Sequence, residues 1–222
     1  MVVRDAHIAG WVPQNGERTA VTNDEDTVLV LRSLKGDSSA FDTLFIKYQT
    51  YIFNVIYGML GDREEARDVT QDVFLQAHRS LAKFRGGAKL STWLYRIAVN
   101  KAADFKRSPR SRFLPQIFEN LLSEKSPEHL QPERQYVINV EQGIVQSALM
   151  LCPLQHREIL ALRYYSDLSL EEIAQTMQCS AGAAKVRLHR AREVFRERYM
   201  VMIEESQSIV HGEEQDVNKI AI

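Results

Sequence analysis

The stretch that most constrains the fold is residues 168–192, LSLEEIAQTMQCSAGAAKVRLHRAR, which predicts a helix, a tight turn and a second helix. Ser169 can accept from first-turn backbone N–H groups, and Glu172, three residues later, can reach back to Ser169. Ser180 can cap the second helix. The first helix has one apolar face, because apolar residues recur at i, i+3, i+4 and i+7: Leu170, Ile173, Ala174 and Met177.

The second helix of this stretch has two contrasting sides. A small, apolar side suits packing on a partner helix, and it comprises Ala184, Leu188, Ala191 and Phe195. The opposite side carries Val186, His189 and Arg190, with Lys185, Arg192 and Arg196 on one flank and Arg187 on the other. A helix that enters a DNA major groove needs this division, so the pattern indicates a helix-turn-helix. An ordinary helical hairpin with a solvated basic face is the alternative.

The charge balance restricts any nucleic-acid surface to local patches. The net charge of the 222 residues is −1, so a uniformly basic protein is excluded. Residues 96–112 and 185–198 are basic, whereas residues 62–72, 119–141 and 204–216 are acidic.

The chain shows no feature of a secreted, membrane or metal-dependent protein. Cys152 and Cys179 form no CxxC motif and are expected to be free thiols in a reducing compartment, with a disulfide as the alternative. There is no signal peptide and no apolar run that could cross a bilayer, so a cytoplasmic location without membrane insertion is expected. No HExxH, CxxC or glycine-rich phosphate loop occurs, and no catalytic residue, metal site or cofactor is expected.

Composition and periodicity predict an all-α fold of two small helical domains joined by a flexible linker, the second with the helix-turn-helix. Prolines and acidic residues mark the linker. The expected parts are a disordered N-terminal extension (1–22), a helical domain (23–108), the linker (109–135), a second helical domain (136–202) and a disordered acidic tail (203–222).

Two surfaces of the first domain stand apart from its apolar stripes. In residues 62–81 the inward stripe is Val69, Val73, Ala77 and Leu81, and the positions away from it are Asp68, Gln71, Asp72 and Leu75. In residues 91–107, Trp93, Arg96, Asn100 and Arg107 lie away from the inward side and follow a basic, glycine-containing loop at 84–89. Aromatic rings, cations and amides together suit unpaired nucleic acid. The alternative is that Trp93 and Tyr95 are core residues and the cations are solvated.

Three segments together resemble a known family: residues 62–81 (DREEARDVTQDVFLQAHRSL), 84–107 (FRGGAKLSTWLYRIAVNKAADFKR) and 168–192. They are similar to the signature segments of bacterial extracytoplasmic-function (ECF, group 4) sigma factors of the sigma-70 family. The resemblance covers about residues 24–200. It implies that residues 23–108 form the sigma-70 region 2 domain, that residues 136–202 form the region 4 domain, and that the chain has no enzymatic activity.

The resemblance also implies roles for individual residues. The segment that docks on core RNA polymerase corresponds to Asp68, Gln71, Asp72 and Leu75. The segment that melts and reads the −10 element corresponds to Phe84, Arg85, Lys89, Trp93, Arg96, Asn100, Lys101 and Arg107. The −35 readers and their phosphate-contacting neighbours correspond to Arg163, Lys185, Val186, Arg187, His189, Arg190 and Arg192. Ala181, Ala183, Ala184 and Val186 depart from the usual family residues, so the preferred −35 sequence is not assigned.

The function implied is that of a sigma subunit, which binds the clamp helices and flap of core RNA polymerase and directs it to −10 and −35 promoter elements. The expected regulon is of a stress or envelope type, and the expected inhibitor is an anti-sigma factor. A stand-alone helix-turn-helix regulator is the alternative, and an enzyme is a third possibility that no motif favours.

Overall fold

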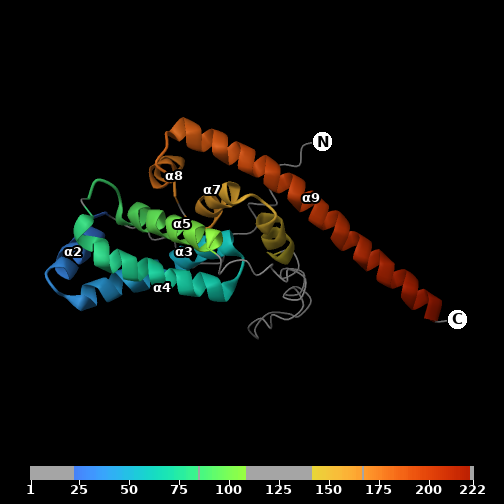
Figure 1. The fold of residues 1–222 in the computed structure, drawn as a ribbon, viewed down its shortest axis with the longest axis horizontal. Coiled ribbons are helices and arrows are strands. Elements are labelled where there is room, and N and C mark those ends of the chain that lie inside the picture. The colour runs from blue at the N-terminus through green and yellow to red at the C-terminus, as the bar shows by residue number, and fades with distance from the viewer. Residues whose placement is uncertain (1–22, 85, 109–141, 167, 221–222) are drawn as a thin grey trace.

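The computed structural model describes residues 23–84, 86–108, 142–166 and 168–220, and within these ranges it describes the side chains of residues 25–204. Regular structure in these ranges is helical, with no strand, so the predicted all-α fold is confirmed. The predicted N-terminal extension, the predicted linker at 109–135 and Arg85 lie outside the described residues. Figure 1 shows the long helices of the first half side by side, with the second half packed above them.

The N-terminal helical unit, residues 23–108, is built around α3. Its long helices α3, α4 and α5 pack on one another, and α2 packs against α3. The centre of α3 is fully buried at Ile52, Val55, Ile56 and Met59, and burying each such side chain stabilises the fold by about 1.5–3 kcal/mol. The element bounds are α2 Asn23–Leu34, α3 Ser38–Leu60, α4 Arg63–Ser80, the 3-10 turn η1 Leu81–Lys83 and α5 Leu90–Arg107.

Local signals set the boundary between α3 and α4. Gly61 ends α3 in the left-handed conformation at φ +85°, and its N–H donates to the Tyr57 carbonyl at 2.8 Å. This backbone conformation favours glycine, which has no Cβ. Asp62 then caps α4, because its Oδ1 accepts from the Glu65 N–H at 2.8 Å.

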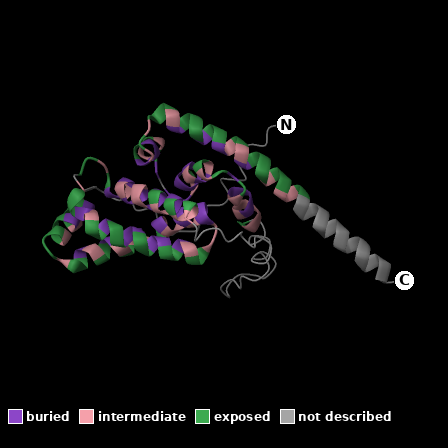
Figure 2. Cartoon of the chain, viewed as in Figure 1, coloured by how far each residue is buried: buried purple, intermediate pink, exposed green. Residues whose placement is uncertain are grey.

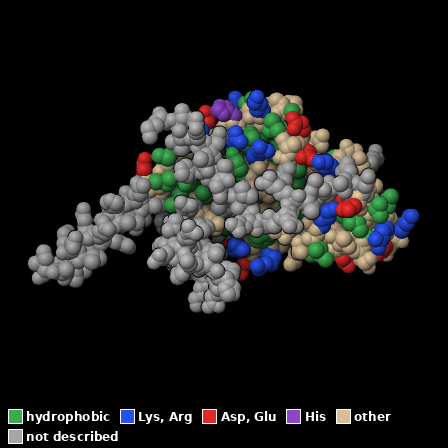
Figure 3. Space-filling view, turned by 180° about the vertical axis from the view of Figure 1, so that it is seen from behind, with side chains coloured by type: hydrophobic (Ala, Val, Ile, Leu, Met, Phe, Trp, Pro, Cys, Tyr) green, Lys and Arg blue, Asp and Glu red, His purple; other side chains and the backbone are tan. Residues whose placement is uncertain are grey.

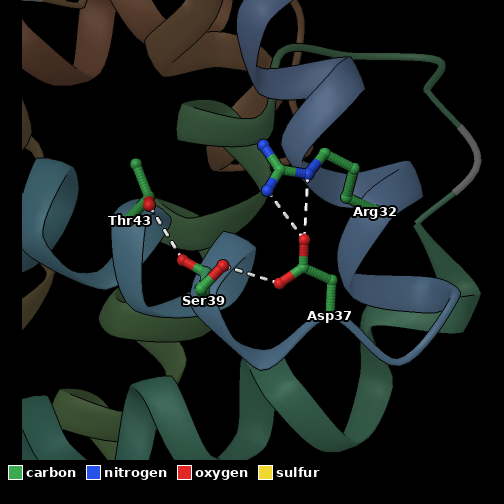
Figure 4. A network of polar contacts seen from close by, with 4 residues as sticks. All are labelled: Arg32, Asp37, Ser39 and Thr43. Atoms are coloured by element: carbon green, nitrogen blue, oxygen red, sulfur yellow. Dashed lines mark hydrogen bonds and ion pairs between the residues drawn. The ribbon is translucent and has the colours of Figure 1, made fainter.

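Polar contacts hold α2 against the start of α3. Figure 4 shows the carboxylate of Asp37 between Arg32 and Ser39. Arg32 Nε and Nη2 donate to Asp37 Oδ2 at 3.0 and 2.7 Å, and Ser39 Oγ donates to Oδ1 at 2.6 Å. Hydrogen bonds from Ser39 and then from Arg32 lower the pKa of Asp37. Asp37 therefore uses its carboxylate to join two helices and makes no side-chain cap on α3.

The C-terminal helical unit, residues 142–220, begins with a helical segment at 142–150. α9 packs on both α7 and α8. Figure 1 shows α9 running past the other helices and out of the body. The bounds are α7 Leu154–Tyr164, α8 Leu170–Thr176 and α9 Ala181–Ile220.

The structure differs from the prediction of an irregular acidic tail at 203–222, because α9 continues as a helix to Ile220. No proline, which would interrupt a helix, follows Pro153. Gly212 alone lowers helix stability by only about 1 kcal/mol.

The two helical units are docked against each other, with α3 packed on α7 and α5 packed on α8. Their buried side chains form one continuous apolar cluster, visible as purple inner faces in Figure 2. Gly58 permits the close approach, since a Cβ there would lie 3.0 Å from the Tyr165 ring. Arg157 of α7 also lies in this contact. It is 8% exposed, and its Nη1 donates to the Met59 carbonyl at 2.9 Å.

Candidate nucleic-acid interface

The helix-turn-helix is formed by α8 and α9 and has the predicted caps. Ser169 and Glu172 make the reciprocal capping box, with Glu172 N to Ser169 Oγ at 3.2 Å and Ser169 N to Glu172 Oε2 at 2.8 Å. In the turn, Gln178 adopts a left-handed φ of 53°. Ser180 Oγ accepts from the Ala183 N–H at 3.1 Å at the start of α9. The geometry of this motif is therefore fixed largely by short-range hydrogen bonds.

The two sides of α9 separate as predicted. The inward side, Ala184, Leu188, Ala191 and Phe195, is buried. The outward side is exposed, and it comprises Lys185, Val186, Arg187, His189 and Arg190. His189 Nε2 lies 3.5 Å from Glu193 Oε1 on the next turn. In Figure 3, Lys and Arg side chains with a histidine lie along the upper edge, while elsewhere on that face basic and acidic side chains are interspersed.

Arg163 and Arg192 make hydrogen bonds that connect α7 with the helix-turn-helix. The Nε of Arg192 donates to the Tyr164 hydroxyl at 3.0 Å, and its guanidinium lies 5.8 Å from the Tyr164 ring centroid. Arg163 is exposed, and its Nη1 donates to the Leu168 carbonyl at 3.3 Å. Arg163 therefore holds α7 to the segment that follows it, and Arg192 holds α9 to α7. The sequence pattern did not indicate either role.

The aromatic and basic face predicted for the first domain lies at the start of α5. The rings of Phe84 and Trp93 are 5.5 Å apart and tilted by 50°, and both side chains are half-buried against the core. Tyr95, in contrast, is buried, which fits the alternative that made it a core residue. Asn100 is exposed, so its amide is available to a ligand. The remaining candidates are Lys89 and Arg107, which are exposed, and Arg96 and Lys101, which are half-buried.

Two cations of this face contact α8 of the other helical unit. Lys89 Nζ lies 2.7 Å from Glu172 Oε1, and Arg96 Nη2 donates to the Gln175 carbonyl at 2.7 Å. No periodicity could reveal these contacts, because the partners are about 80 residues apart in the sequence. The structure thus brings the first helix of the helix-turn-helix onto the candidate −10 face.

The candidate polymerase-docking face lies on α4 and is free of the core. Asp68, Gln71, Asp72 and Leu75 are all exposed, with Leu75 at 55%. The neighbouring stripe of Val69, Val73 and Ala77 is buried. The fold therefore needs none of the four outward side chains for packing.

The described residues offer little other chemistry. Cys152 and Cys179 are both free. Among the residues that the structure places, no cluster of histidine, cysteine or carboxylate side chains could hold a metal ion. Within the same part of the chain, no helix combines the length and hydropathy needed to span a membrane.

Comparison with known proteins agrees with this geometry. Residues 44–112 match the family described as Sigma-70 region 2, and residues 143–194 match Sigma-70, region 4. The ECF RNA polymerase sigma-E factor of Escherichia coli is 36% identical over 176 residues, covering 76% of this chain and 91% of the relative. The chain belongs to the ECF sigma factors. It is an RNA polymerase sigma factor.

This chain also aligns with further ECF-type relatives over nearly their full length. The RNA polymerase sigma-H factor of Pseudomonas aeruginosa is 36% identical, covering 78% of this sigma factor and 93% of the relative. The ECF RNA polymerase sigma factor SigW of Bacillus subtilis is 32% identical, covering 73% and 90%. A solved structure of CnrH in complex with the cytosolic domain of CnrY has a TM-score of 0.57 at 22% identity, covering 78% of this chain and 96% of that chain, and supports the fold.

Proposed function

We propose that this sigma factor belongs to group 4 of the sigma-70 family and directs core RNA polymerase to −10 and −35 promoter elements. Residues 23–108 act as region 2 and residues 136–202 as region 4, joined by the linker at 109–135. The sigma factor itself catalyses no reaction, it works where the polymerase works, in the cytoplasm, and its regulon is of a stress or envelope type.

The observation that supports this proposal is that one chain carries two surfaces of different chemistry, each suited to a different form of DNA. The outward side of α9 suits duplex DNA, since long cations flank the short Val186. The α5 region suits an unpaired strand, since the half-buried rings of Phe84 and Trp93 lie at the start of the helix that also carries the exposed Asn100. A stand-alone repressor that binds duplex has no use for the second surface.

Strand opening tests the α5 surface. Extruding a base costs a few kcal/mol, and stacking on an aromatic ring returns about 1–3 kcal/mol per base. Trp93→Ala and Asn100→Ala should each leave core binding intact and reduce open complexes on duplex promoters, as measured by permanganate footprinting. On a template already melted at −10, the Trp93→Ala defect should largely disappear and the Asn100→Ala defect should persist. Normal thymine reactivity in both variants on duplex DNA would assign these residues to the core alone.

Readout of the −35 element tests α9. Arg190 is exposed on the outward side, and an arginine can pair with a guanine through two hydrogen bonds. Arg190→Ala in the holoenzyme should weaken promoter binding by about 1–3 kcal/mol and relax preference at one −35 position. Arg192 lies on the flank and holds α9 to Tyr164, so Arg192→Ala should weaken binding to all sequences alike and lower its salt dependence. The opposite assignment of these two effects would mean that another side of α9 faces the DNA.

Binding to core polymerase tests α4. Asp68 and Asp72 lie one turn apart and are exposed. Asp68→Arg combined with Asp72→Arg should leave the circular dichroism melt almost unchanged and sharply reduce core binding through like-charge repulsion. Binding at wild-type strength would remove this face as the docking site.

An anti-sigma factor is included in the proposal because the solved relatives support it. One relative, with a TM-score of 0.54, is titled a complex of the sigma factor RpoE with the anti-sigma factor NepR from Bartonella quintana. For this chain, such an inhibitor would be a protein that binds the purified sigma factor and blocks its association with core polymerase.

A further inference from the structure

Arg192 differs from the neighbouring cations of α9 in its surroundings. It is half-buried, whereas the others are exposed: Lys185, Arg187, Arg190 and Arg196. Its partner is Tyr164, the last residue of α7, whose hydroxyl accepts from Arg192 Nε at 3.0 Å. The guanidinium also lies 5.8 Å from the centre of the Tyr164 ring, a distance at which a cation is attracted to an aromatic face. One side chain of α7 therefore holds this arginine through both its ring and its hydroxyl.

Tyr164 has a fixed position, because the end of α7 is held on both sides of it. The Tyr164 side chain is half-buried against the apolar core. Directly before it, Arg163 Nη1 donates to the Leu168 carbonyl at 3.3 Å. Directly after it, Tyr165 is buried. The Tyr164 ring therefore has little freedom to move away from Arg192.

The contact with Tyr164 uses only part of the Arg192 guanidinium. A guanidinium has five N–H donors in a planar fork, and the hydroxyl takes the one on Nε. Nη1 and Nη2 of Arg192 make no hydrogen bond or ion pair to the part of the chain that the structure describes. Their N–H groups can form two parallel hydrogen bonds to a phosphate. Arg192 is thus held at one edge of its guanidinium and is open to a ligand at the other.

Arg192 also stands in a row of cations along one flank of α9. Lys185 lies seven residues before it and Arg196 lies four residues after it, and both are exposed. Spacings of four and seven residues place side chains on the same side of a helix. When the outward side of a helix lies in the major groove, its flanks lie beside the phosphate backbones. The position of Arg192 therefore suits a phosphate contact better than a base contact.

We propose that Tyr164 is a positioning residue for −35 binding: it holds Arg192 so that the terminal nitrogens of the guanidinium meet a DNA phosphate. This inference rests on the proposed function, which assigns duplex DNA to the outward side and flanks of α9. An arginine loses side-chain conformational freedom when it binds, and Tyr164 restricts that freedom before DNA arrives. Through Tyr164, α7 contributes to DNA affinity without touching the DNA.

The test measures how strongly the full chain binds a fluorescein-labelled DNA duplex of mixed sequence at several salt concentrations. A mixed sequence is suitable, because a phosphate contact carries no sequence information. Each lost phosphate contact should reduce the slope of log affinity against log salt by about 0.9. We expect this reduction for Arg192→Ala, and a similar one for Tyr164→Ala, which removes both the ring and the hydroxyl.

A double-mutant cycle separates positioning from folding. Tyr164→Phe keeps the ring and removes the acceptor for Arg192 Nε, so it should weaken duplex binding about two- to tenfold, the range of one hydrogen bond. In an Arg192→Ala background, Tyr164→Phe should have no further effect on binding. Equal effects in the two backgrounds overturn the proposal, because the hydroxyl would then act through the fold and not through Arg192.

Ser169→Ala is the control for lost stability. It removes one half of the capping box of α8 and lies outside the proposed DNA-binding residues. We expect it to lower the free energy of unfolding in urea and to leave the salt slope at the wild-type value. If Ser169→Ala and Tyr164→Ala reduce the slope equally, loss of stability explains both results and the proposal is rejected. If Tyr164→Ala loses helical circular dichroism, the cycle with Tyr164→Phe decides.

The outcomes distinguish this inference from the proposed function. A wild-type slope for Tyr164→Ala, with a reduced slope for Arg192→Ala, rejects the positioning role and keeps α9 as the DNA-binding helix. A wild-type slope for Arg192→Ala removes Arg192 from the phosphate contacts, and the role of Tyr164 with it. Transcription of genomic DNA fragments by core polymerase with the wild-type chain is measured separately, by sequencing the transcripts. Absence of promoter-specific transcripts there rejects the proposed function.

Discussion

Replacing Gly58 with alanine sets two opposing free energies against each other. Alanine is favoured over glycine inside a helix by about 1 kcal/mol. The new Cβ, however, would lie 3.0, 3.1 and 3.2 Å from three ring carbons of Tyr165, which is 7% exposed and hydrogen-bonded to Gln146. A ring held in this way cannot shift far to accommodate the new Cβ, and overpacking costs about 1–3 kcal/mol. Gly58→Ala should therefore lower the free energy of unfolding by about 0–2 kcal/mol.

A double-mutant cycle separates the two effects. In a Tyr165→Ala background the clash is absent, so Gly58→Ala should raise the free energy of unfolding by about 1 kcal/mol. Equilibrium urea unfolding of the full chain, followed by circular dichroism, measures all four proteins. The reasoning is refuted if Gly58→Ala stabilises both backgrounds equally, because α3 and Tyr165 would then not be in contact in solution.

Three further predictions concern α8 and its turn. Ser169→Ala should lower the free energy of unfolding by about 1 kcal/mol in a urea titration, since it removes one half of the capping box. Gln178→Gly should raise that free energy by up to about 1 kcal/mol and Gln178→Val should lower it, because the φ of 53° suits glycine and not a β-branched residue. Burial raises the pKa of Glu172, but hydrogen bonds from Lys89 and Ser169 bring it below 4.5. Stability from Glu172 is therefore present above pH 4.5 and lost as the pH falls through the lowered pKa, and stability curves of wild type and Glu172→Gln should converge there.

Features that depend on neighbours in the sequence could be predicted. The caps at Asp62, Ser169 and Ser180 and the end of α3 at Gly61 each follow from residues within a few positions. The apolar stripe of α9 follows from the helical period alone. These signals define helices and their faces, and they carry no information on how two sets of helices meet.

Docking of the two units could not be predicted, because it depends on complementarity between distant residues. From the sequence alone, Gly58 is an unfavourable residue inside a helix. The structure explains it, because the Tyr165 ring lies where a side chain at position 58 would be. Arg157 resembles an exposed cation, yet the carbonyl of Met59 accepts its hydrogen bond in a buried place. For the candidate −10 face, periodicity predicted that Asn100 is exposed but not that α8 holds Arg96.

The thiol of Cys152 is expected to be unreactive while the chain is folded. It is 2% exposed and donates to the Ala148 carbonyl at 3.3 Å, and burial raises its pKa to about 11. Compared with a thiol at the ordinary value of 9.0, a shift to about 11 leaves about a hundredfold less thiolate at neutral pH. Since the thiolate is the reactive form, alkylating reagents and oxidants should modify Cys152 only in molecules whose C-terminal helices have come apart. Modification of Cys152 thus reports unfolding of the chain. The half-buried Cys179 serves as the internal reference for a more accessible thiol.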